Sequence, residues 1–185
     1  MPEIDPAKLR AAQAAAALVN EGMVVGLGSG TTASLVIRQL ADRVRFEGLR
    51  FMGVPTSEAT GILARSLGIS LCDLDEVEAL DLDIDGADEV DPQFRLIKGR
   101  GAALLREKIV ATASRRRAMV ISPQKRVERL GKRFPVPLEV SPFGLRHTDR
   151  YLRDLGAQTT LRRREDGSPL ITDGGHKIID CHFGE

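Results

Sequence analysis

The sequence predicts an α/β protein with a mostly parallel sheet flanked by helices, followed by a small α+β appendage. Short apolar segments alternate with helical segments of roughly ten residues from the amino terminus to about residue 125, a pattern typical of βαβ units around a parallel sheet. Beyond that point, a proline-containing extended segment, one helix and hairpin-like strands replace the alternation. We therefore expect one main domain and one small one.

The predicted helices of the main domain are delimited by caps and by glycines. Asp5 and Pro6 suit the cap and the first position of a helix over residues 6–20, which Gly22 can end. Gly68 can end a later helix in the same way. The further helices of this domain are expected over residues 33–44, 58–67 and 102–113.

The predicted strands are the short apolar segments between these helices. In the main domain they are expected at residues 23–26, 51–54, 69–72, 80–84 and 118–121. Segment 134–140 is extended, and its prolines suit an edge strand or a crossing between domains. A helix over 147–155, ended by Gly156, follows it. The last strands are expected at residues 157–161, 170–172 and 177–181, with a turn at 166–167.

Composition and charge limit the classes of partner. Of the 185 residues, 42% are hydrophobic and 29% are charged, which suits an ordinary protein with a buried core. The formal net charge is +1, so no global field favours nucleic acid or a membrane surface. Two basic runs, residues 115–117 and 162–164, are expected on solvated edges.

The cysteines and the hydropathy bear on the compartment. Cys72 and Cys181 are far apart in sequence and belong to no CxxC pair, which argues against a structural zinc site or a disulfide scaffold. No apolar run approaches the roughly 18 residues that span a bilayer. The alanine-rich start contains Gln13 and suits an amphipathic helix better than a signal core. We therefore expect a cytoplasmic protein.

A glycine-rich loop, residues 26–32, lies between the first predicted strand and the second predicted helix. Glycines let the backbone approach an anion, and the amides and dipole at a helix amino terminus attract phosphate. Dinucleotide binding is disfavoured because its fingerprint needs a third glycine where Thr31 stands. A simple strand-to-helix turn remains an alternative. The candidate phosphate-binding residues are Gly28, Ser29, Gly30, Thr31 and Thr32.

Residues 55–57, Pro-Thr-Ser, repeat this arrangement after the next strand. Their hydroxyls are able to serve as helix caps only. Together with the glycine loop, however, they place hydroxyls and amides at the carboxyl edge of a parallel sheet, where ligands of open α/β sheets bind.

Two carboxylates, Asp85 and Asp88, flank Gly86-Ala87 at the end of an apolar strand. Paired carboxylates are able to handle the protons of sugar hydroxyls, to cap a turn or to bind a metal. No histidine lies nearby and the spacing is not that of a calcium loop, so the metal ranks third and no metal site is predicted. A purely structural role, in which the two carboxylates only cap a turn, remains the alternative.

Glu107 is a candidate general base and Lys98 a candidate cation for an oxyanion. The helical neighbours of Glu107 at three and four residues are all apolar: Ala103, Leu104, Val110 and Ala111. Burial on that face would raise the pKa of Glu107 and make it a better base, unless it reaches solvent or pairs with a distant cation. Lys98, between a strand-like triplet and Gly99, is able to stabilise an oxyanion or is an ordinary loop lysine.

These motifs, in this order, resemble ribose-5-phosphate isomerase of the A type. The resemblance covers nearly the whole chain, and its central Asp-Gly-Ala-Asp-Glu, Lys-Gly and Arg-Glu-Lys motifs are highly specific. The matching segments are residues 26–33, 53–57, 85–90, 97–99, 105–109, 135–140, 172–173 and 178–180.

The resemblance implies an aldose–ketose isomerase that interconverts D-ribose 5-phosphate and D-ribulose 5-phosphate through an enediolate, without metal or organic cofactor, in the non-oxidative pentose phosphate pathway. By position, Glu107 matches the base and Lys98 the cation beside the substrate oxygens. Asp85 matches a residue of ring opening and hydroxyl contact, and Asp88 its neighbour in the pocket. The matching substrate- and phosphate-binding residues are Gly28, Ser29, Gly30, Thr31, Thr32, Lys8, Gly99 and Lys125.

The resemblance also implies a Rossmann-like catalytic domain over residues 1–130, a small α+β (ferredoxin-like) lid over 131–185, and a homodimer. Three features depart from the family pattern. Arg100 stands where glycine is typical, and residues 173–176 read Asp-Gly-Gly-His rather than Asp-Asn-Gly-Asn. The chain stops at Glu185, so we expect a shortened lid. A non-catalytic sugar-phosphate sensor is the alternative, although it would not need Glu107 on an apolar helical face.

Overall fold

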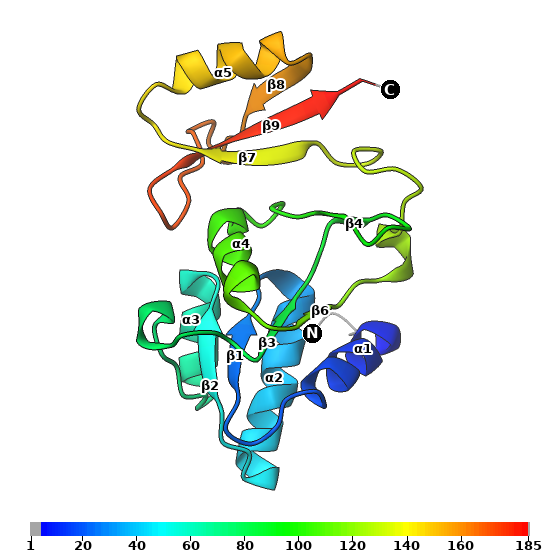
Figure 1. Ribbon diagram of the computed structural model, residues 1–185, viewed down its shortest axis with the longest axis vertical. Coiled ribbons are helices and arrows are strands. Elements are labelled where there is room, and N and C mark those ends of the chain that lie inside the picture. Colours follow the sequence, from blue (N-terminus) through cyan, green and yellow to red (C-terminus); the bar gives the residue numbers. More distant parts are fainter. Residues whose placement is uncertain (1–4, 185) are drawn as a thin grey trace. The chain divides into compact units, whose positions relative to one another are not determined.

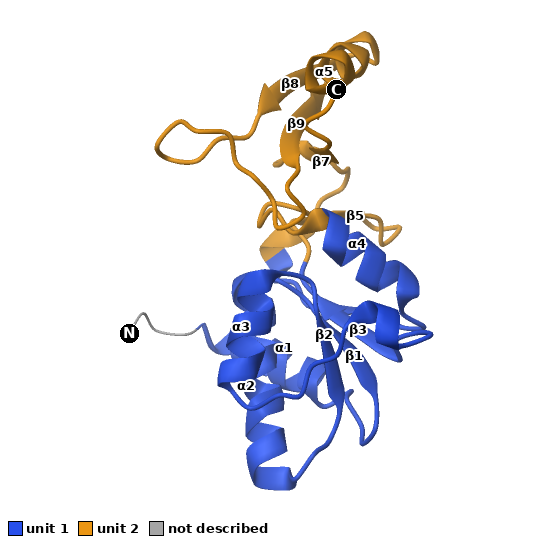
Figure 2. Ribbon diagram, turned by 90° about the vertical axis from the view of Figure 1, so that its left-hand side faces the viewer, with its two compact units in different colours: residues 1–86, 105–123 blue, residues 87–104, 124–185 orange. Residues whose placement is uncertain are grey.

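The computed structural model describes residues 5–184, and its chain divides into two compact units (Figures 1 and 2). The first unit holds the residues up to Gly86 together with Leu105–Pro123. The second unit holds Ala87–Leu104 and the residues from Gln124 onward. The predicted domain boundary between residues 130 and 131 stays a prediction, because compactness alone does not define a domain.

The first unit is built on a four-stranded parallel sheet with the strand order β2-β1-β3-β6 (Figure 1). The observed sheet confirms the predicted α/β class. Its strands are β1 (Val24–Leu27), β2 (Met52–Pro55), β3 (Leu82–Asp85) and β6 (Arg117–Met119).

Helices cover both faces of this sheet. The helices are α1 (Pro6–Ala16), α2 (Gly30–Glu47), α3 (Glu58–Ser66) and α4 (Leu104–Ala113). In Figure 2, α1, α2 and α3 lie on one side of the sheet and α4 on the other. The main core joins residues of the first three helices to one face of the strands, and a smaller cluster around Val54, Leu80 and Val110 lies under α4. The sheet is therefore buried on both faces, as parallel sheets require.

Of the four described helices of the first unit, α1 and α2 differ most from their predicted bounds. The Asp5 carboxylate accepts the Ala7 amide at 2.9 Å and caps α1, but the helix ends at Ala16 rather than at residue 20. Helix α2 begins at Gly30 rather than at residue 33, so that Thr31 and Thr32 belong to its first turn.

Two predicted strands are wrong. Residues 69–72 form no strand and contribute only an isolated parallel bridge between Leu71 and Gly53. Residues 170–172 are likewise irregular, and the nearby pairing is a bridge between Arg163 and Pro169. Both segments are apolar, but too few of their backbone groups meet a neighbouring strand to form a ladder. A short 3₁₀ turn, η1 (Leu74–Glu76), follows the first of them.

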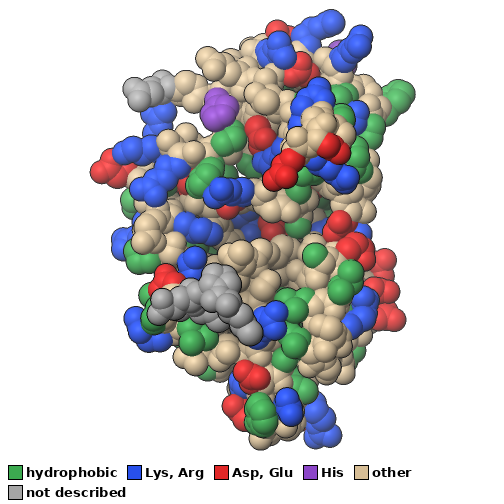
Figure 3. All heavy atoms as spheres, turned by 180° about the vertical axis from the view of Figure 1, so that it is seen from behind, with side chains coloured by type: hydrophobic (Ala, Val, Ile, Leu, Met, Phe, Trp, Pro, Cys, Tyr) green, Lys and Arg blue, Asp and Glu red, His purple; other side chains and the backbone are tan. Residues whose placement is uncertain are grey.

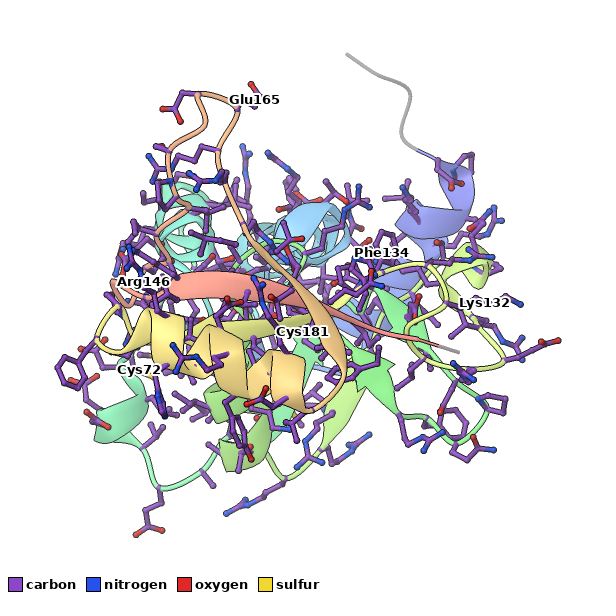
Figure 4. All side chains as sticks on the ribbon, turned by 90° about the horizontal axis from the view of Figure 1, so that it is seen from above. Cys72, Lys132, Phe134, Arg146, Glu165 and Cys181 are labelled. Carbon is purple, nitrogen blue, oxygen red and sulfur yellow. The ribbon has the colours of Figure 1, made fainter. Side chains whose placement is uncertain are left out.

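The second unit contains a three-stranded antiparallel sheet with the order β7-β9-β8. Its strands are β7 (Val136–Val140), β8 (Ala157–Leu161) and β9 (Lys177–Phe183). Helix α5 (Leu145–Asp154) covers one face, where Leu152, Ala157, Ile179 and Cys181 form a small core. Cys181 and Glu165 are labelled in Figure 4, with Glu165 at the tip of the long β8–β9 loop.

A short antiparallel pair, β4 (Glu89–Val90) and β5 (Leu96–Ile97), also belongs to the second unit. The buried Glu89 carboxylate accepts the amides of Gly131 and Arg133 at 2.6 Å and of Phe134 at 3.0 Å. Three charge-assisted hydrogen bonds of this kind fix the chain that leads from η2 (Pro123–Lys125) into β7.

One face of the molecule carries charged side chains of both signs. Lys and Arg side chains are interspersed with Asp and Glu side chains on the face shown in Figure 3. Among residues 5–184, no helix is both long enough and apolar enough to cross a membrane.

Candidate functional site

The glycine loop lies at the carboxyl edge of the parallel sheet, beside the end of β3. The Gly28 amide donates to the Ile84 carbonyl at 3.0 Å. A Cβ placed on Gly28 would lie 2.2 Å from the Asp85 carboxylate oxygen Oδ1 and 2.6 Å from its Cα. Only glycine fits this close approach, so the sequence pattern of the loop reflects direct packing of β1 against β3.

Asp85 is buried and tied to this loop. Its Oδ1 accepts the Ser29 amide at 3.2 Å and the Gly86 amide at 2.6 Å. The structure thus brings together two predicted site residues that are 56 positions apart, Ser29 and Asp85.

A chain of hydroxyl groups joins the glycine loop to the end of β2. Thr56 Oγ1 donates to the Leu27 carbonyl at 3.1 Å, so the 2.7 Å contact between Ser29 Oγ and Thr56 Oγ1 has Ser29 as donor. Thr60 Oγ1 donates to the Gly28 carbonyl at 3.1 Å, and Ser57 caps α3 through the Thr60 amide. The hydroxyls after β1 and β2 therefore meet at one edge, as their positions in the sequence indicate.

Thr56 belongs to the Pro-Thr-Ser segment that was expected at this edge, although it is not among the predicted phosphate-binding residues. Thr60 was missed, because it lies inside α3. The available signal was that α3 begins at the same sheet edge as α2, which places residues of its first turn beside the glycine loop.

The first turn of α2 has the features of an anion site. Ser29 occupies the cap position but its side chain does not cap the helix, because it is turned toward Thr56. Gly30 has a φ of +90°, a conformation that favours glycine. The amides of Gly30, Thr31 and Thr32 begin an 18-residue helix, whose amino terminus carries partial positive charge.

Glu107 lies on the buried face of α4, which confirms the predicted burial. It is 5% exposed, and with Val110 it forms the buried side of the helix. Val110 Cγ1 lies 2.6 Å from the position a Cβ on Gly26 would take, so α4 packs closely on β1. Since α4 leads back to the parallel strand β6, its amino end lies at the carboxyl edge of the sheet. Glu107, one turn before Val110, is displaced toward that edge.

Asp88 and Lys98 belong to the second unit, at the open end of the β4–β5 pair. Glu89 pairs with Ile97, so Asp88 and Lys98 are the next positions on the two strands. The Asp88 amide donates to the Ile97 carbonyl at 2.8 Å, and its carboxylate accepts the Arg100 amide at 2.9 Å. The hairpin therefore positions the segment 98–100 (the Lys98 loop) around the Asp88 carboxylate.

Arg100, which departs from the family pattern, is exposed and contacts an aromatic ring. Its guanidinium lies 5.0 Å from the centre of the Phe134 ring, a cation–π contact. Phe134 is labelled in Figure 4. With arginine at this position, the loop backbone is bound to Asp88 and the side chain contacts Phe134, which precedes β7.

The predicted site residues are divided between the two units. The first unit holds Lys8, the loop residues Gly28 to Thr32, Asp85 and Glu107; the second holds Asp88, Lys98, Gly99 and Lys125. Lys8 lies on α1, which packs against α2, and Lys125 ends η2.

Neither cysteine has the character of a nucleophile or a metal ligand. Burial, followed by the nearby Glu76 and Asp73 carboxylates, raises the pKa of Cys72. Burial, followed by Asp180 and Asp149, raises the pKa of Cys181. Within residues 5–184, no group of three or more His, Cys, Asp and Glu side chains is arranged to hold a metal ion.

Comparison with known protein sequences shows the family of this chain. The family model described as ribose 5-phosphate isomerase A (phosphoriboisomerase A) matches residues 52–185. A protein named Ribose-5-phosphate isomerase A from Thermomicrobium roseum is 53% identical over 179 residues, covering 96% of this chain and 75% of that protein. A protein of the same name from Synechococcus sp. (strain JA-3-3Ab) is 51% identical over 185 residues, covering 100% of this chain and 80% of that protein.

Solved structures of proteins with the same name have a similar fold. Ribose 5-phosphate isomerase A from Methanocaldococcus jannaschii superposes with a TM-score of 0.93 at 40% identity, covering 96% of this chain and 79% of that one. A D-ribose-5-phosphate isomerase in complex with phospho-erythronic acid gives a TM-score of 0.93 at 37% identity, covering 98% and 80%.

Proposed function

The chain belongs to the ribose 5-phosphate isomerase A family, and from that premise we propose that it interconverts D-ribose 5-phosphate and D-ribulose 5-phosphate through an enediolate, in the non-oxidative pentose phosphate branch. The observation that carries the mechanism is the buried carboxylate of Glu107, displaced toward the sheet edge where the glycine loop and Asp85 meet.

Glu107 acts as the base in this proposal. Its carboxylate takes the proton from C2 of the open-chain aldose, and the electrons of the C–H bond form the enediolate. The same group returns a proton to C1, while the hydroxyl proton of O2 passes to O1, which leaves the ketose with no net change in atoms. A base that serves both carbons must lie on one side of the enediolate plane, which a single buried side chain on a rigid helix satisfies.

The glycine loop binds the substrate phosphate. The amides of Gly30, Thr31 and Thr32 are donors at the start of a long helix, and the hydroxyls of Thr31 and Thr32 add to them. Gly28 and Ser29 shape the loop, because their amides are bonded to Ile84 and Asp85. Lys8 and Lys125 supply positive charge on the phosphate side.

The remaining groups handle the sugar oxygens. Asp85 accepts protons from hydroxyls during ring opening, with Asp88 beside it along the chain. Lys98, preceding Gly99, stabilises the negative charge that develops on the enediolate oxygens. A carboxylate and an ammonium in these roles make the proton transfers possible without a metal or an organic cofactor.

The ligand of one relative supports this mechanism. The isomerase structure with 37% identity contains phospho-erythronic acid. That compound pairs a phosphate with a planar carboxylate, which has the shape and charge of an enediolate. Compounds that resemble a transition state or intermediate bind an isomerase more tightly than its substrate does.

Incubation of the purified chain with ribose 5-phosphate tests the proposal. We expect ribulose 5-phosphate to form without added cofactor, and free ribose to be a poor substrate because it lacks the phosphate. A folded sample that binds ribose 5-phosphate without forming a ketopentose phosphate would refute the isomerase and favour the sensor. Equal efficiency with free ribose would refute the assignment of the glycine loop.

We also propose that the protein is a homodimer of the cytoplasm. Light scattering on the eluting peak of a sizing column measures the mass directly. A mass of one chain at assay concentration would overturn the dimer.

A further inference from the structure

The side chain of Arg162, just after β8, is bonded to the Lys98 loop. Its Nη1 donates to the Gly99 carbonyl at 2.7 Å and to the Arg100 carbonyl at 3.3 Å. Nε donates to Asp180 Oδ2 at 2.9 Å, and Nη2 donates to Asp180 Oδ1. One guanidinium thus joins a carboxylate on β9 to two successive carbonyls of the loop. The sequence had indicated a solvated edge for residues 162–164, which is wrong for Arg162.

The loop packs on the face of the small sheet opposite α5. Ile179 and Cys181 point toward α5, so Asp180, between them, points to the other face. Asp180 pairs directly with Pro137, and Pro137 Cγ lies 2.8 Å from the position of a Cβ on Gly99. Gly99 is therefore in contact with the same face that presents Asp180 and Arg162.

The geometry is one that arginine alone provides. The side chains of Arg162 and Asp180 are 17% and 16% exposed, so the pair is largely shielded from solvent. The planar guanidinium is able to hold a carboxylate with two donors while a third reaches the loop, whereas a lysine ammonium is a single point of charge. Gly99 has a φ of +109°, a backbone conformation that residues other than glycine rarely adopt.

We propose that Arg162, oriented by Asp180, is a positioning residue that holds the Lys98 loop in the geometry that catalysis needs. The inference rests on the proposed function, in which Lys98 acts on the substrate oxygens. Arg162 is given no contact with substrate and works through the backbone that follows Lys98. The small sheet then serves as the support for a catalytic cation, in addition to any role as a lid.

The neighbouring arginines supply a matched control. Arg163 and Arg164 are exposed, and the Arg163 guanidinium donates to Gly167 within its own turn. Arg164→Met removes the same charge from the same basic run without touching the Lys98 loop. Arg162→Met removes the guanidinium but keeps most of the length of the side chain.

Hydrogen–deuterium exchange of the full chain tests the contact without relying on activity. The Ala102 amide donates to the Gly99 carbonyl at 3.1 Å, and the Arg100 amide to Asp88, so both report on the loop. In Arg162→Met we expect exchange of these amides to rise about tenfold or more, because charge-assisted hydrogen bonds are lost. Peptides of β7 and β9 should change little, and Arg164→Met should match wild type.

Kinetics with ribose 5-phosphate test the positioning role. Arg162→Met should lower kcat by about 10–100-fold with a smaller change in KM, because displacing a catalytic group by about 1 Å costs that much. Arg162→Lys should recover part of the loss through one of the carbonyls, and Arg164→Met should retain full activity.

The outcomes separate the two claims. Unchanged exchange in the loop, or an equal rise throughout the second unit, overturns the proposal, since Arg162 then plays no role or only a general structural one. Faster loop exchange with wild-type kcat also overturns it. If the wild-type chain forms no ribulose 5-phosphate, the proposed function fails, and with it the positioning role, whereas the exchange data still decide whether Arg162 holds the loop. If Arg162→Met does not fold, Asp180→Asn replaces it, with the same expected direction and a smaller effect.

Discussion

The two units differ less in the kind of polar contact they make than in the core that surrounds it. In the first, the Asp85 carboxylate accepts two amides, and Ser29 and Thr60 join neighbouring strand ends through hydroxyls and carbonyls. In the second, the Glu89 carboxylate accepts three amides, and Arg162 joins Asp180 to the Lys98 loop.

The cores around these contacts differ in size. The first unit has an extended core on both faces of its sheet. Under α5 of the second unit, the described core cluster contains four buried residues: Leu152, Ala157, Ile179 and Cys181. A small core fixes backbone positions weakly, so charge-assisted hydrogen bonds supply what packing does not. The first unit should therefore be most sensitive to changes of volume, and the second to changes of charge.

The largest expected effect concerns Glu107, the buried carboxylate assigned to the transfer of the carbon-bound proton. Glu107→Gln keeps the volume of the side chain and removes the base, so kcat should fall about 10²–10⁴-fold while substrate binding changes little. Steady-state kinetics and a binding titration measure the two quantities. Glu47→Gln, at the exposed end of α2, is the control and should keep full activity. Activity of Glu107→Gln within a few-fold of wild type would refute the role of the residue.

The sensitivity of the first unit to volume is tested at Gly28. Gly28→Ala places a methyl group against Asp85, which no rotation relieves, and should lower the free energy of unfolding by about 1–3 kcal/mol and weaken phosphate binding. Urea denaturation measures the first effect. The control is Gly61→Ala in α3, where the nearest side-chain atoms lie at 3.4 Å and alanine favours the helix. Equal stabilities of the two variants would show that the loop is not close-packed.

The sensitivity of the second unit to charge is tested at Glu89. Glu89→Gln preserves the volume of the side chain but replaces one accepting oxygen by an NH₂ group, which faces backbone N–H groups and accepts no hydrogen bond from them. The free energy of unfolding should fall by on the order of 1 kcal/mol. Glu128→Gln, at a side chain that is 92% exposed, should cost nothing measurable. Exchange of the Gly131, Arg133 and Phe134 amides localises the effect. Unchanged protection of these amides would contradict the claim that Glu89 fixes the entry to β7.

The smallest effect is expected at acid pH, in the turn after β4. Burial raises the pKa of Asp91, but the Arg95 amide and guanidinium and the Gln93 amide outweigh it and hold the pKa below its usual value. Because the folded pKa is lower than the unfolded one, the stabilisation is present above about pH 4 and is lost as pH falls through the folded pKa. Asp91→Asn should therefore destabilise the protein at neutral pH and less at acid pH, as urea titrations at several pH values measure. A constant difference across pH would contradict this account.

Much of the first unit was predictable because its signals are local. Glycine and hydroxyl residues follow β1 and β2 at the strand ends, and the apolar neighbours of Glu107 indicate its buried face. What failed depends on pairing between distant segments. Residues 69–72 have the composition of a strand but make a single β-bridge, between Leu71 and Gly53. Residues 170–172 make no β-bridge.

The contact of Arg162 with the Lys98 loop was unpredictable for the same reason. It depends on the register of β8 against β9, which places Thr160 opposite Asp180 and brings Arg162 to the same face. In sequence, the residue is only the first of three arginines. A side chain whose partners are distant in sequence, such as Arg162, gives no local sequence signal. A residue that directly follows a strand does give one, because its position in the sheet is set by that strand.

Isomerisation in ²H₂O tests the central claim, that Glu107 transfers the proton through an enediolate. The purified chain would be incubated with ribose 5-phosphate in ²H₂O, and the products followed by ¹H NMR. The account predicts ribulose 5-phosphate with deuterium at C1, because the carboxylate exchanges its proton with solvent, and loss of this exchange in Glu107→Gln. Ketose formed without any deuterium, or exchange that persists at the wild-type rate in Glu107→Gln, would contradict it.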